Sequence, residues 1–318
     1  MKPDVLRVRG LSVRYHTPGG AVRAAADLTF SLRADERLGI AGESGSGKST
    51  MALSLLRLIK PPGRIESGEI WLDGLDLMTL ADEEMRRVRL ARIALVPQGS
   101  MNSLNPVLRI REQVADALRD HGVRITRREI DERVRELLHR VGLGAEVAGL
   151  FPHQLSGGMK QRACIAVAMS LSPRVIVADE PTSALDVVVQ KQVMDTLARA
   201  QADLGASVIL VGHDMGLMAQ FVDRLGIMYA GKLVEVSPIR DVLTDPLHPY
   251  TRMLIASLPS LERKGVFQGI PGLPPPLRDL PAGCAFHPRC PLAIERCRTE
   301  SPALREARPD AWAACHLV

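Results

Sequence analysis

Two short motifs in this sequence combine the residue types that bind phosphate groups and metal ions. The first, Gly-Glu-Ser-Gly-Ser-Gly-Lys-Ser at 42–49, fits the phosphate-loop pattern G-x-x-x-x-G-K-[ST]. Its glycines let backbone amides converge on phosphate oxygens, and the helix expected from Lys48 directs the positive end of its dipole at the same group. We expect Lys48 to reach the β- and γ-phosphates and Ser49 to ligate Mg²⁺. The motif predicts a nucleoside triphosphate site.

The second motif is an apolar run, Val175–Ala178, followed by Asp179 and Glu180. Asp179 is expected in the Mg²⁺ shell, and Glu180 is expected to orient the attacking water or accept its proton. Alone, these acids could simply be a solvated strand end. The phosphate loop upstream favours the catalytic interpretation.

Two other apolar runs end near residues that could join this site: Ile93–Val96 precedes Gln98, and Val208–Val211 precedes His213. Ligands bind at the carboxyl ends of strands in open α/β sheets. If the runs share one sheet, Gln98 can join the metal and water shell and His213 can contact a γ-phosphate oxygen. The predicted catalytic residues are therefore Glu180, His213 and Gln98.

The segment Leu-Ser-Gly-Gly-Met-Lys-Gln-Arg at 155–162 predicts a second anion-binding helix start. Ser156 is a good N-cap, and Gly157 and Gly158 leave the first amides open to an anion. An ordinary capped helix is the alternative. Since the chain already has one complete phosphate loop, the simplest geometry presents Ser156–Gly158 to a nucleotide held by a facing subunit.

The elements that must position these residues indicate an α/β fold. The apolar runs, with Leu38–Ala41 before the phosphate loop, have the composition of strands buried on both faces. Residues 102–150 are rich in Arg, Glu and Leu at helical spacing, which predicts a helical insert. Ten of the 22 prolines lie in 259–318, so we expect a separate C-terminal segment.

That segment also holds four of the five cysteines, within the last 35 residues: Cys284, Cys290, Cys297 and Cys315. In a chain with no export signal, such a group suggests metal before disulfides. Structural zinc sites usually contain a close cysteine pair, which is missing here, whereas iron–sulfur clusters accept wider spacing. Free or disulfide-linked thiols stay open. Cys164 is predicted to be a buried packing residue.

Composition argues against several classes of protein. Of 318 residues, 46% are hydrophobic and 24% charged, as in ordinary globular chains. No apolar run approaches the ~18–20 residues of a membrane span, and the N-terminus lacks an apolar signal region. Aromatic residues make up only 3%, and the net charge of +5 is spread along the chain, so no nucleic-acid partner is expected.

The motifs LSGGMKQR, GESGSGKST, VPQ, VADEPTSALD and GHD, with their spacing, resemble the nucleotide-binding subunit of an ABC transporter. The resemblance covers about residues 5–255. It implies an ABC-type P-loop NTPase domain, with a mostly parallel sheet core, an antiparallel β subdomain and a helical insert at about 102–165. It also implies two ATP molecules sandwiched head to tail between two subunits. Asp186 matches the loop that communicates across the dimer, and Tyr15 matches the aromatic that stacks on adenine.

The residues predicted by motif and resemblance to bind nucleotide form two sets. Those for the chain's own ATP are Tyr15, Gly42, Ser44, Gly45, Ser46, Gly47, Lys48, Ser49, Thr50, Gln98 and Asp179; those for the partner's ATP are Ser156, Gly157 and Gly158. Ser49, Gln98 and Asp179 are the expected Mg²⁺ ligands. Since Glu180 is present, hydrolysis is expected rather than binding alone.

Further segments, PQGSMNSLNP, HPYTRMLIASLP, IPGLPPPL and GCAFHPRCPLAIERC, resemble the oligopeptide/dipeptide group of bacterial importers. This resemblance implies an ATPase domain over 1–257 and a C-terminal domain over 258–318. It also implies a [4Fe–4S] cluster on the four cysteines, with Zn²⁺ as the alternative. The implied partners are a second, homologous ATPase subunit, two permease subunits and an extracytoplasmic solute-binding protein, at the cytoplasmic face of the bacterial inner membrane.

Peptide is the expected solute, although relatives carry nickel, opines, glutathione or oligosaccharides. Two non-transport alternatives fit less well. ABC ATPases of DNA repair insert long coiled coils or zinc segments between the phosphate loop and the acidic strand, and ribosome-acting ABC proteins usually carry two such domains. This chain shows neither feature.

Overall fold

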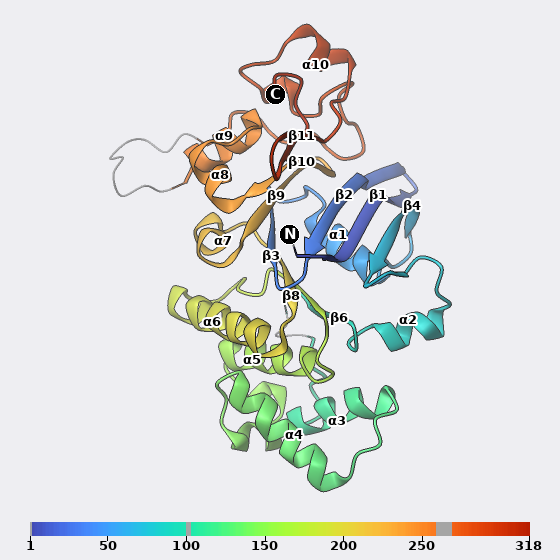
Figure 1. Ribbon diagram of the computed structural model, residues 1–318, viewed down its shortest axis with the longest axis vertical. Helices are drawn as coiled ribbons and strands as arrows, with labels where there is room; N and C mark the ends of the chain where they lie inside the picture. Colours follow the sequence, from blue (N-terminus) through green and yellow to red (C-terminus); the bar gives the residue numbers. More distant parts are fainter. Residues whose placement is uncertain (1, 100–102, 259–268) are drawn as a thin grey trace. The chain divides into compact units, whose positions relative to one another are not determined.

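The computed structural model describes residues 2–99, 103–258 and 269–318 (Figure 1). The chain forms two compact units, each built from separate segments. The first contains the segment ending at Leu6, Ser31–Glu36 and Trp71–Leu210; the second contains Arg7–Phe30, Arg37–Ile70 and Val211–Val318. The domain boundary predicted at 257/258 adjoins residues outside the described ranges and stays a prediction, as does the start of the insert at 102.

The first unit has three strands in the order β8 (Ser207–Val211), β7 (Val175–Asp179) and β6 (Ile93–Val96). Strands β6 and β7 are parallel, with Val96 opposite Ala178. Every residue of β7 and β8 is buried, as expected for parallel strands covered on both faces. This parallel register brings the residues that follow β6 and β7 to the same edge of the sheet.

Helices make up most of the rest of the first unit. They are α2 (Asp82–Val88), α3 (Ile110–Asp120), α4 (Arg127–Arg140), α5 (Gly157–Ala168) and α6 (Val187–Leu204), with short 3-10 turns η2 (Ala145–Gly149) and η3 (Pro152–Gln154). Helices α3, α4 and α5 pack on one another and lie in the region predicted as a helical insert (Figure 1). Helix α4 begins where Thr126 and Glu129 form a capping box. Within the described residues, no helix has both the length and the apolar character to cross a bilayer.

Strands β1 (Asp4–Thr17), β2 (Gly20–Arg33) and β4 (Gly63–Leu72) form a small sheet in the order β2–β1–β4, and β5 (Leu75–Asp76) pairs antiparallel with the end of β4. Only two residues connect β1 to β2, so the two strands form an antiparallel hairpin. Buried and exposed residues alternate along β2, which is typical of a sheet with one solvated face. This is the antiparallel subdomain that the resemblance implied.

The larger sheet of the second unit has the order β11 (Arg305–Arg308), β12 (Ala311–Ala313), β10 (Lys232–Pro238), β9 (Arg224–Tyr229) and β3 (Arg37–Ala41). Strands β3 and β9 are parallel, and the remaining pairs are antiparallel. The C-terminal segment therefore extends this sheet, with β12 paired to β10. The helices of this unit are α1 (Lys48–Leu55), α7 (Met215–Phe221), α8 (Ile239–Thr244), α9 (Pro249–Ala256) and α10 (Glu295–Thr299), with the 3-10 turn η4 (His287–Arg289).

A cluster of three aromatic side chains packs the C-terminal segment against the rest of the second unit. Phe286 packs against Tyr229 of β9 and Tyr250 of α9, with ring centroids 5.2 and 5.3 Å away, and the two tyrosines are 4.7 Å apart. All three side chains are fully buried. Such pairs contribute about 0.5–1.5 kcal/mol each beyond the area they bury, so the cluster is a substantial anchor in a chain poor in aromatics.

Candidate functional site

The loop at 42–47 connects β3 to α1, and its backbone lies too close to neighbouring strands for side chains at two positions. A Cβ on Gly47 would lie 2.1 Å from the Ala24 carbonyl oxygen, and one on Gly42 would lie 2.2 Å from that of Met228. Both glycines also have positive φ, 100° and 151°. Glycine is therefore required at both positions by the path of the chain.

The polar groups of this loop suit an anion. The Lys48 ammonium is buried and donates to the carbonyl oxygens of Gly42, at 2.9 Å, and Glu43, at 3.0 Å. The Ser46 hydroxyl is buried and has no hydrogen-bond partner among the described residues. An unsatisfied buried hydroxyl costs about 1–3 kcal/mol, which a phosphate oxygen would relieve. Ser44 and Gly45 are exposed, while Ser49 and Thr50 lie half-buried in the first turn of α1.

In the first unit, the structure brings together two of the predicted catalytic residues. Gln98 follows β6, Glu180 follows β7, and the Gln98 amide donates to the Glu180 carboxylate at 2.8 Å. Asp179, the last residue of β7, is buried. Glu180 has a φ of 45°, a left-handed conformation that costs a non-glycine residue about 1–2 kcal/mol. The hydrogen bond holds the Glu180 carboxylate beside the Gln98 amide at the end of the two strands.

The start of helix α5 is capped as predicted, but one of its glycines has an additional role. The exposed Ser156 hydroxyl accepts a hydrogen bond from the Met159 amide at 3.3 Å. A Cβ on Gly158 would lie 2.4 Å from Val189 Cγ1 on α6, so close packing of the two helices requires this glycine. Both glycines were expected to bind an anion, and the packing contact of Gly158 was not predicted, because nothing local to Gly158 identifies its neighbour.

Asp186 is the N-cap of α6 and accepts from the Val189 amide at 3.0 Å. The next two residues, Val187 and Val188, are 80% and 68% exposed. Two large apolar side chains in solvent beside a capped helix start are consistent with a surface that meets another protein. The predicted communication role of Asp186 stays a prediction.

His213 and Tyr15 belong to the second unit, as does the phosphate loop. His213 is exposed, and the preceding Gly212 donates to the Ile40 carbonyl oxygen of β3 at 3.1 Å. Tyr15 is half-buried in β1, with its ring against Gly63. Gln98, Asp179, Glu180 and Ser156–Gly158 belong to the first unit, so the nucleotide site that combines both sets stays a prediction.

The four C-terminal cysteines line one small cavity of about 10 Å³, together with His248 and Phe286. Burial raises the pKa of the Cys284, Cys290 and Cys315 thiols above the ordinary value. Four thiols are a donor set that fits an iron–sulfur cluster or zinc. However, no three His, Cys, Asp or Glu side chains in the described part of the chain are arranged to hold a metal ion.

Cys164 lies outside this group, on α5. It is buried, as predicted, and burial raises the pKa of its thiol to about 12. A thiol with so high a pKa is protonated at neutral pH and therefore unreactive.

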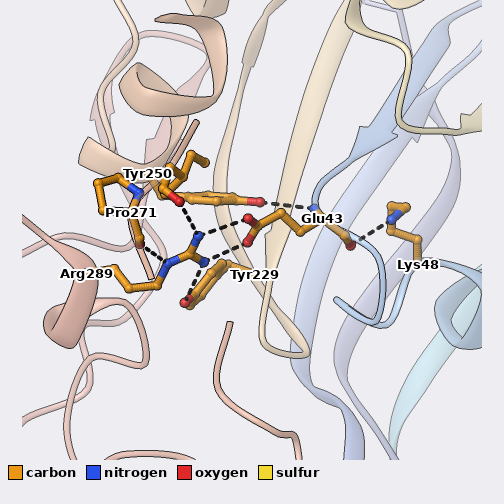
Figure 2. A network of polar contacts seen from close by, with 7 residues as sticks. Glu43, Lys48, Tyr229, Tyr250, Pro271 and Arg289 are labelled. Carbon is orange, nitrogen blue, oxygen red and sulfur yellow. Dashed lines mark hydrogen bonds and ion pairs between the residues drawn. The ribbon is translucent and has the colours of Figure 1, made fainter. Parts of the chain in front are cut away.

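A partly buried network of polar contacts surrounds Glu43 and was not predicted from the sequence (Figure 2). The Arg289 guanidinium donates to both Glu43 carboxylate oxygens, at 2.8 and 3.0 Å, and the Tyr250 hydroxyl accepts from the Glu43 amide at 3.0 Å. Arg289 and Glu43 are 246 residues apart, so no local pattern relates them. Tyr250 and Arg289 lie in the segments HPYT and HPRC, which resemble the oligopeptide/dipeptide group of importers and are the signal in the sequence that points to them.

Two protein families match different parts of this chain. The family described as "ABC transporter" matches residues 25–183, and the family described as "Oligopeptide/dipeptide transporter, C-terminal region" matches residues 234–297. The dipeptide transport ATP-binding protein DppD of Caldanaerobacter subterraneus is 40% identical over 315 residues, which cover 98% of this chain and 97% of that protein. The oligopeptide transport ATP-binding protein OppD of Escherichia coli is 40% identical over 313 residues, with 98% and 92% covered.

Among solved structures, the chain is similar to the ATP-binding cassette MJ0796 in a dimeric, post-hydrolysis state bound to ADP and Pi. The TM-score is 0.66 and the sequence identity 28%, and the match covers 74% of this chain and 99% of that one. A second dimeric structure of MJ0796, described as a bacterial ABC transporter cassette, matches equally well, with a TM-score of 0.66 and 29% identity.

Proposed function

The chain belongs to the ABC transporter ATP-binding family, and on this premise we propose that it is the ATP-hydrolysing subunit of a bacterial oligopeptide/dipeptide importer. Two findings support the transport class: relatives named for peptide transport match nearly the whole chain, and the C-terminal family match is specific to this group. The structural observation that carries the enzymatic part is the hydrogen bond between Gln98 and Glu180 at the ends of parallel strands.

The proposed binding step uses the loop at 42–49. Its amides and the Lys48 ammonium, now bonded to loop carbonyls, turn to the β- and γ-phosphates, and the Ser46 hydroxyl gains an acceptor. Tyr15 stacks on adenine. Ser49, Gln98 and Asp179 provide the hydroxyl, amide and carboxylate oxygens that Mg²⁺ favours. When bound, Mg²⁺ neutralises developing charge on the phosphates.

In the proposed hydrolytic step, Glu180 orients the water and accepts its proton while Gln98 holds the Glu180 carboxylate. The water oxygen bonds to the γ-phosphorus as the bond to the bridging β–γ oxygen breaks, which releases ADP and phosphate. His213 contacts a γ-phosphate oxygen and stabilises the charge that it gains.

The proposed active form is a head-to-tail dimer in which Ser156–Gly158 complete the site built on the partner's phosphate loop. The exposed Val187 and Val188 beside Asp186 support a subunit contact at this end of α6. We propose a heterodimer with a second, homologous ATPase subunit, bound to two permease subunits at the cytoplasmic face of the membrane. An extracytoplasmic solute-binding protein would deliver the peptide.

For the four C-terminal cysteines, we propose a [4Fe–4S] cluster, with Zn²⁺ as the alternative. The supporting observation is that all four thiols line one cavity. Metal must displace the protons of thiols whose pKa burial has raised, so binding should strengthen as the pH rises. Protein purified without oxygen should absorb near 400 nm and carry about four iron atoms per chain. Stoichiometric zinc without iron would favour Zn²⁺. Protein that contains neither iron nor zinc would refute the proposed metal site.

The function is tested by co-expression with candidate permease and ATPase subunits from the same genome. The expected result is that the chain co-purifies with them and that its ATP hydrolysis rises when a dipeptide-loaded solute-binding protein is added. Stimulation by a nickel- or oligosaccharide-loaded binding protein, and not by a peptide-loaded one, would change the solute. A chain that binds DNA or ribosomes and no permease would overturn the transport assignment.

A further inference from the structure

Two C-terminal elements of the second unit hold the same residue of the phosphate loop, Glu43, which directly follows Gly42 (Figure 2). Tyr250, in the first turn of α9, accepts a hydrogen bond from the Glu43 amide. Arg289, at the end of the turn η4, forms a two-pronged ion pair with the Glu43 carboxylate. Neither residue belongs to a nucleotide-binding motif.

The surroundings of Arg289 hold its guanidinium in one place. Its side chain is only 5% exposed, and its nitrogens also donate to the carbonyl oxygens of Pro271, at 2.9 Å, and Ile270, at 3.4 Å, and to the Tyr229 hydroxyl at 3.3 Å. The Phe286 ring lies 6.0 Å from the guanidinium carbon. A fixed planar fork matched to a carboxylate is the strongest common form of charged hydrogen bonding in proteins.

We propose that Arg289 is a positioning residue for ATP binding, which acts by keeping the Glu43 carboxylate away from Lys48. The inference rests on the proposed role of residues 42–49 as the ATP phosphate loop. Tyr250 supports the same arrangement by fixing the Glu43 backbone. The C-terminal segment would then set the ATP affinity of a loop that precedes it by more than two hundred residues.

The charges around Lys48 explain why the position of the Glu43 carboxylate should affect ATP binding. The Lys48 ammonium donates to the Glu43 carbonyl oxygen at 3.0 Å. Residue 43 therefore lies directly beside this cation. Glu43 is 25% exposed, and a carboxylate in that setting without Arg289 would pair with the nearest cation. If that cation is Lys48, Glu43 competes with the phosphates of ATP. Its negative charge near the loop would also repel them.

If Arg289 had a purely structural role, it would only hold the C-terminal segment in place. Arg308 provides a matched control for that role. Arg308 of β11 also ties the C-terminal segment to the rest of the unit, through an ion pair with Asp245, at 2.7 Å, beyond the end of α8. That pair does not involve the phosphate loop. If Arg289 only docks the segment, loss of either arginine should have similar consequences.

The test measures MgATP binding to the full-length chain by calorimetry, with the ATP KM and kcat of the assembled transporter. Arg289→Ala should weaken MgATP binding and raise KM by about ten-fold, with a much smaller change in kcat. Arg289→Lys should lose less, because it keeps the charge but not the fork. Arg308→Ala should stay within about two-fold of the natural chain.

The decisive variant is the double change Arg289→Ala with Glu43→Gln. It removes the same ion pair but also the competing charge, so it should recover most of the lost ATP affinity. Failure to recover, or an equal loss in Arg308→Ala, would overturn the inference. Lys48→Ala separates the two proposals: if it loses ATP binding while Arg289→Ala does not, only this inference fails. If Lys48→Ala binds ATP normally, the phosphate-loop assignment fails as well.

Discussion

Glu180, which follows β7, accepts a hydrogen bond from the Gln98 amide and has a left-handed backbone, and its catalytic role stays a prediction. The motif alone indicated the carboxylate, and the parallel register of β6 and β7 explains why an amide 82 residues away meets it. The glycines of the phosphate loop could likewise be predicted from sequence. Arg289 could not, because a single arginine among many gives no sign of its partner.

The first prediction concerns this carboxylate. Glu180→Gln keeps the shape of the side chain and its hydrogen-bonding capacity but cannot accept a proton from water, so ATP binding should persist while turnover falls by about 10²–10⁴-fold. Calorimetry and phosphate release from the assembled transporter measure the two quantities. Turnover above about a third of the natural rate, outside the range for loss of a general base, would remove Glu180 from that role.

A second prediction at this scale concerns Ser156, which is exposed and caps α5. Ser156→Arg should impair the site built on the partner's phosphate loop, since a large side chain would occupy the place of the partner's γ-phosphate. This chain's own ATP binding should be unaffected. The measurement is nucleotide binding by the isolated subunit and ATP hydrolysis by the assembled pair; loss of binding in the isolated subunit would contradict the head-to-tail arrangement.

At the scale of elements, the buried strands and capped helices followed from local pattern, whereas the C-terminal strands did not. Val175–Asp179 is continuously apolar up to its final acid, and Ser156, the expected N-cap, does cap α5. In contrast, β11 and β12 are short and lie among prolines, and their pairing with β10 depends on residues far away in the sequence. Strand pairing of this kind is set by tertiary packing rather than by propensity.

Helix α9 gives a prediction about pH. His248 is its N-cap and accepts from the Tyr250 amide at 3.0 Å; burial, with a smaller effect of Arg252, lowers the pKa of His248 to about 3. The unfolded chain binds a proton near pH 6.5 and the folded chain does not, so stability is complete above that pH and falls as the pH drops toward 3. Between pH 7 and pH 5 this histidine should account for a loss of about 2 kcal/mol.

Urea titrations of His248→Asn measure this loss. Asparagine can cap the helix but does not titrate, so the variant should lose about 2 kcal/mol less than the natural chain between the two pH values. His139→Asn, an exposed histidine in the last turn of α4, is the control and should behave as the natural chain does. Equal losses in all three proteins would contradict the buried, neutral state of His248.

At the scale of the whole molecule, the ABC-type fold predicted from the motifs is confirmed, and so is membership of the peptide-transport group. Motif spacing sufficed for this because phosphate loop, acidic strand and capped helix each have a fixed chemical role. The cysteine spacing was less informative, since the same four thiols suit different metals or none. The contact between the C-terminal segment and the phosphate loop could be found only in the folded chain, where Arg289 reaches Glu43.

If ATP hydrolysis by this chain drives peptide import, the two processes must be coupled, and transport in sealed vesicles measures that coupling. The complete transporter is reconstituted with ATP on the side of this subunit and a labelled dipeptide with its binding protein on the other. We predict accumulation of the dipeptide across the membrane that requires ATP and is lost with Glu180→Gln in this chain. ATP hydrolysis without dipeptide movement, or movement that persists at the natural rate in the Glu180→Gln transporter, would contradict the claim.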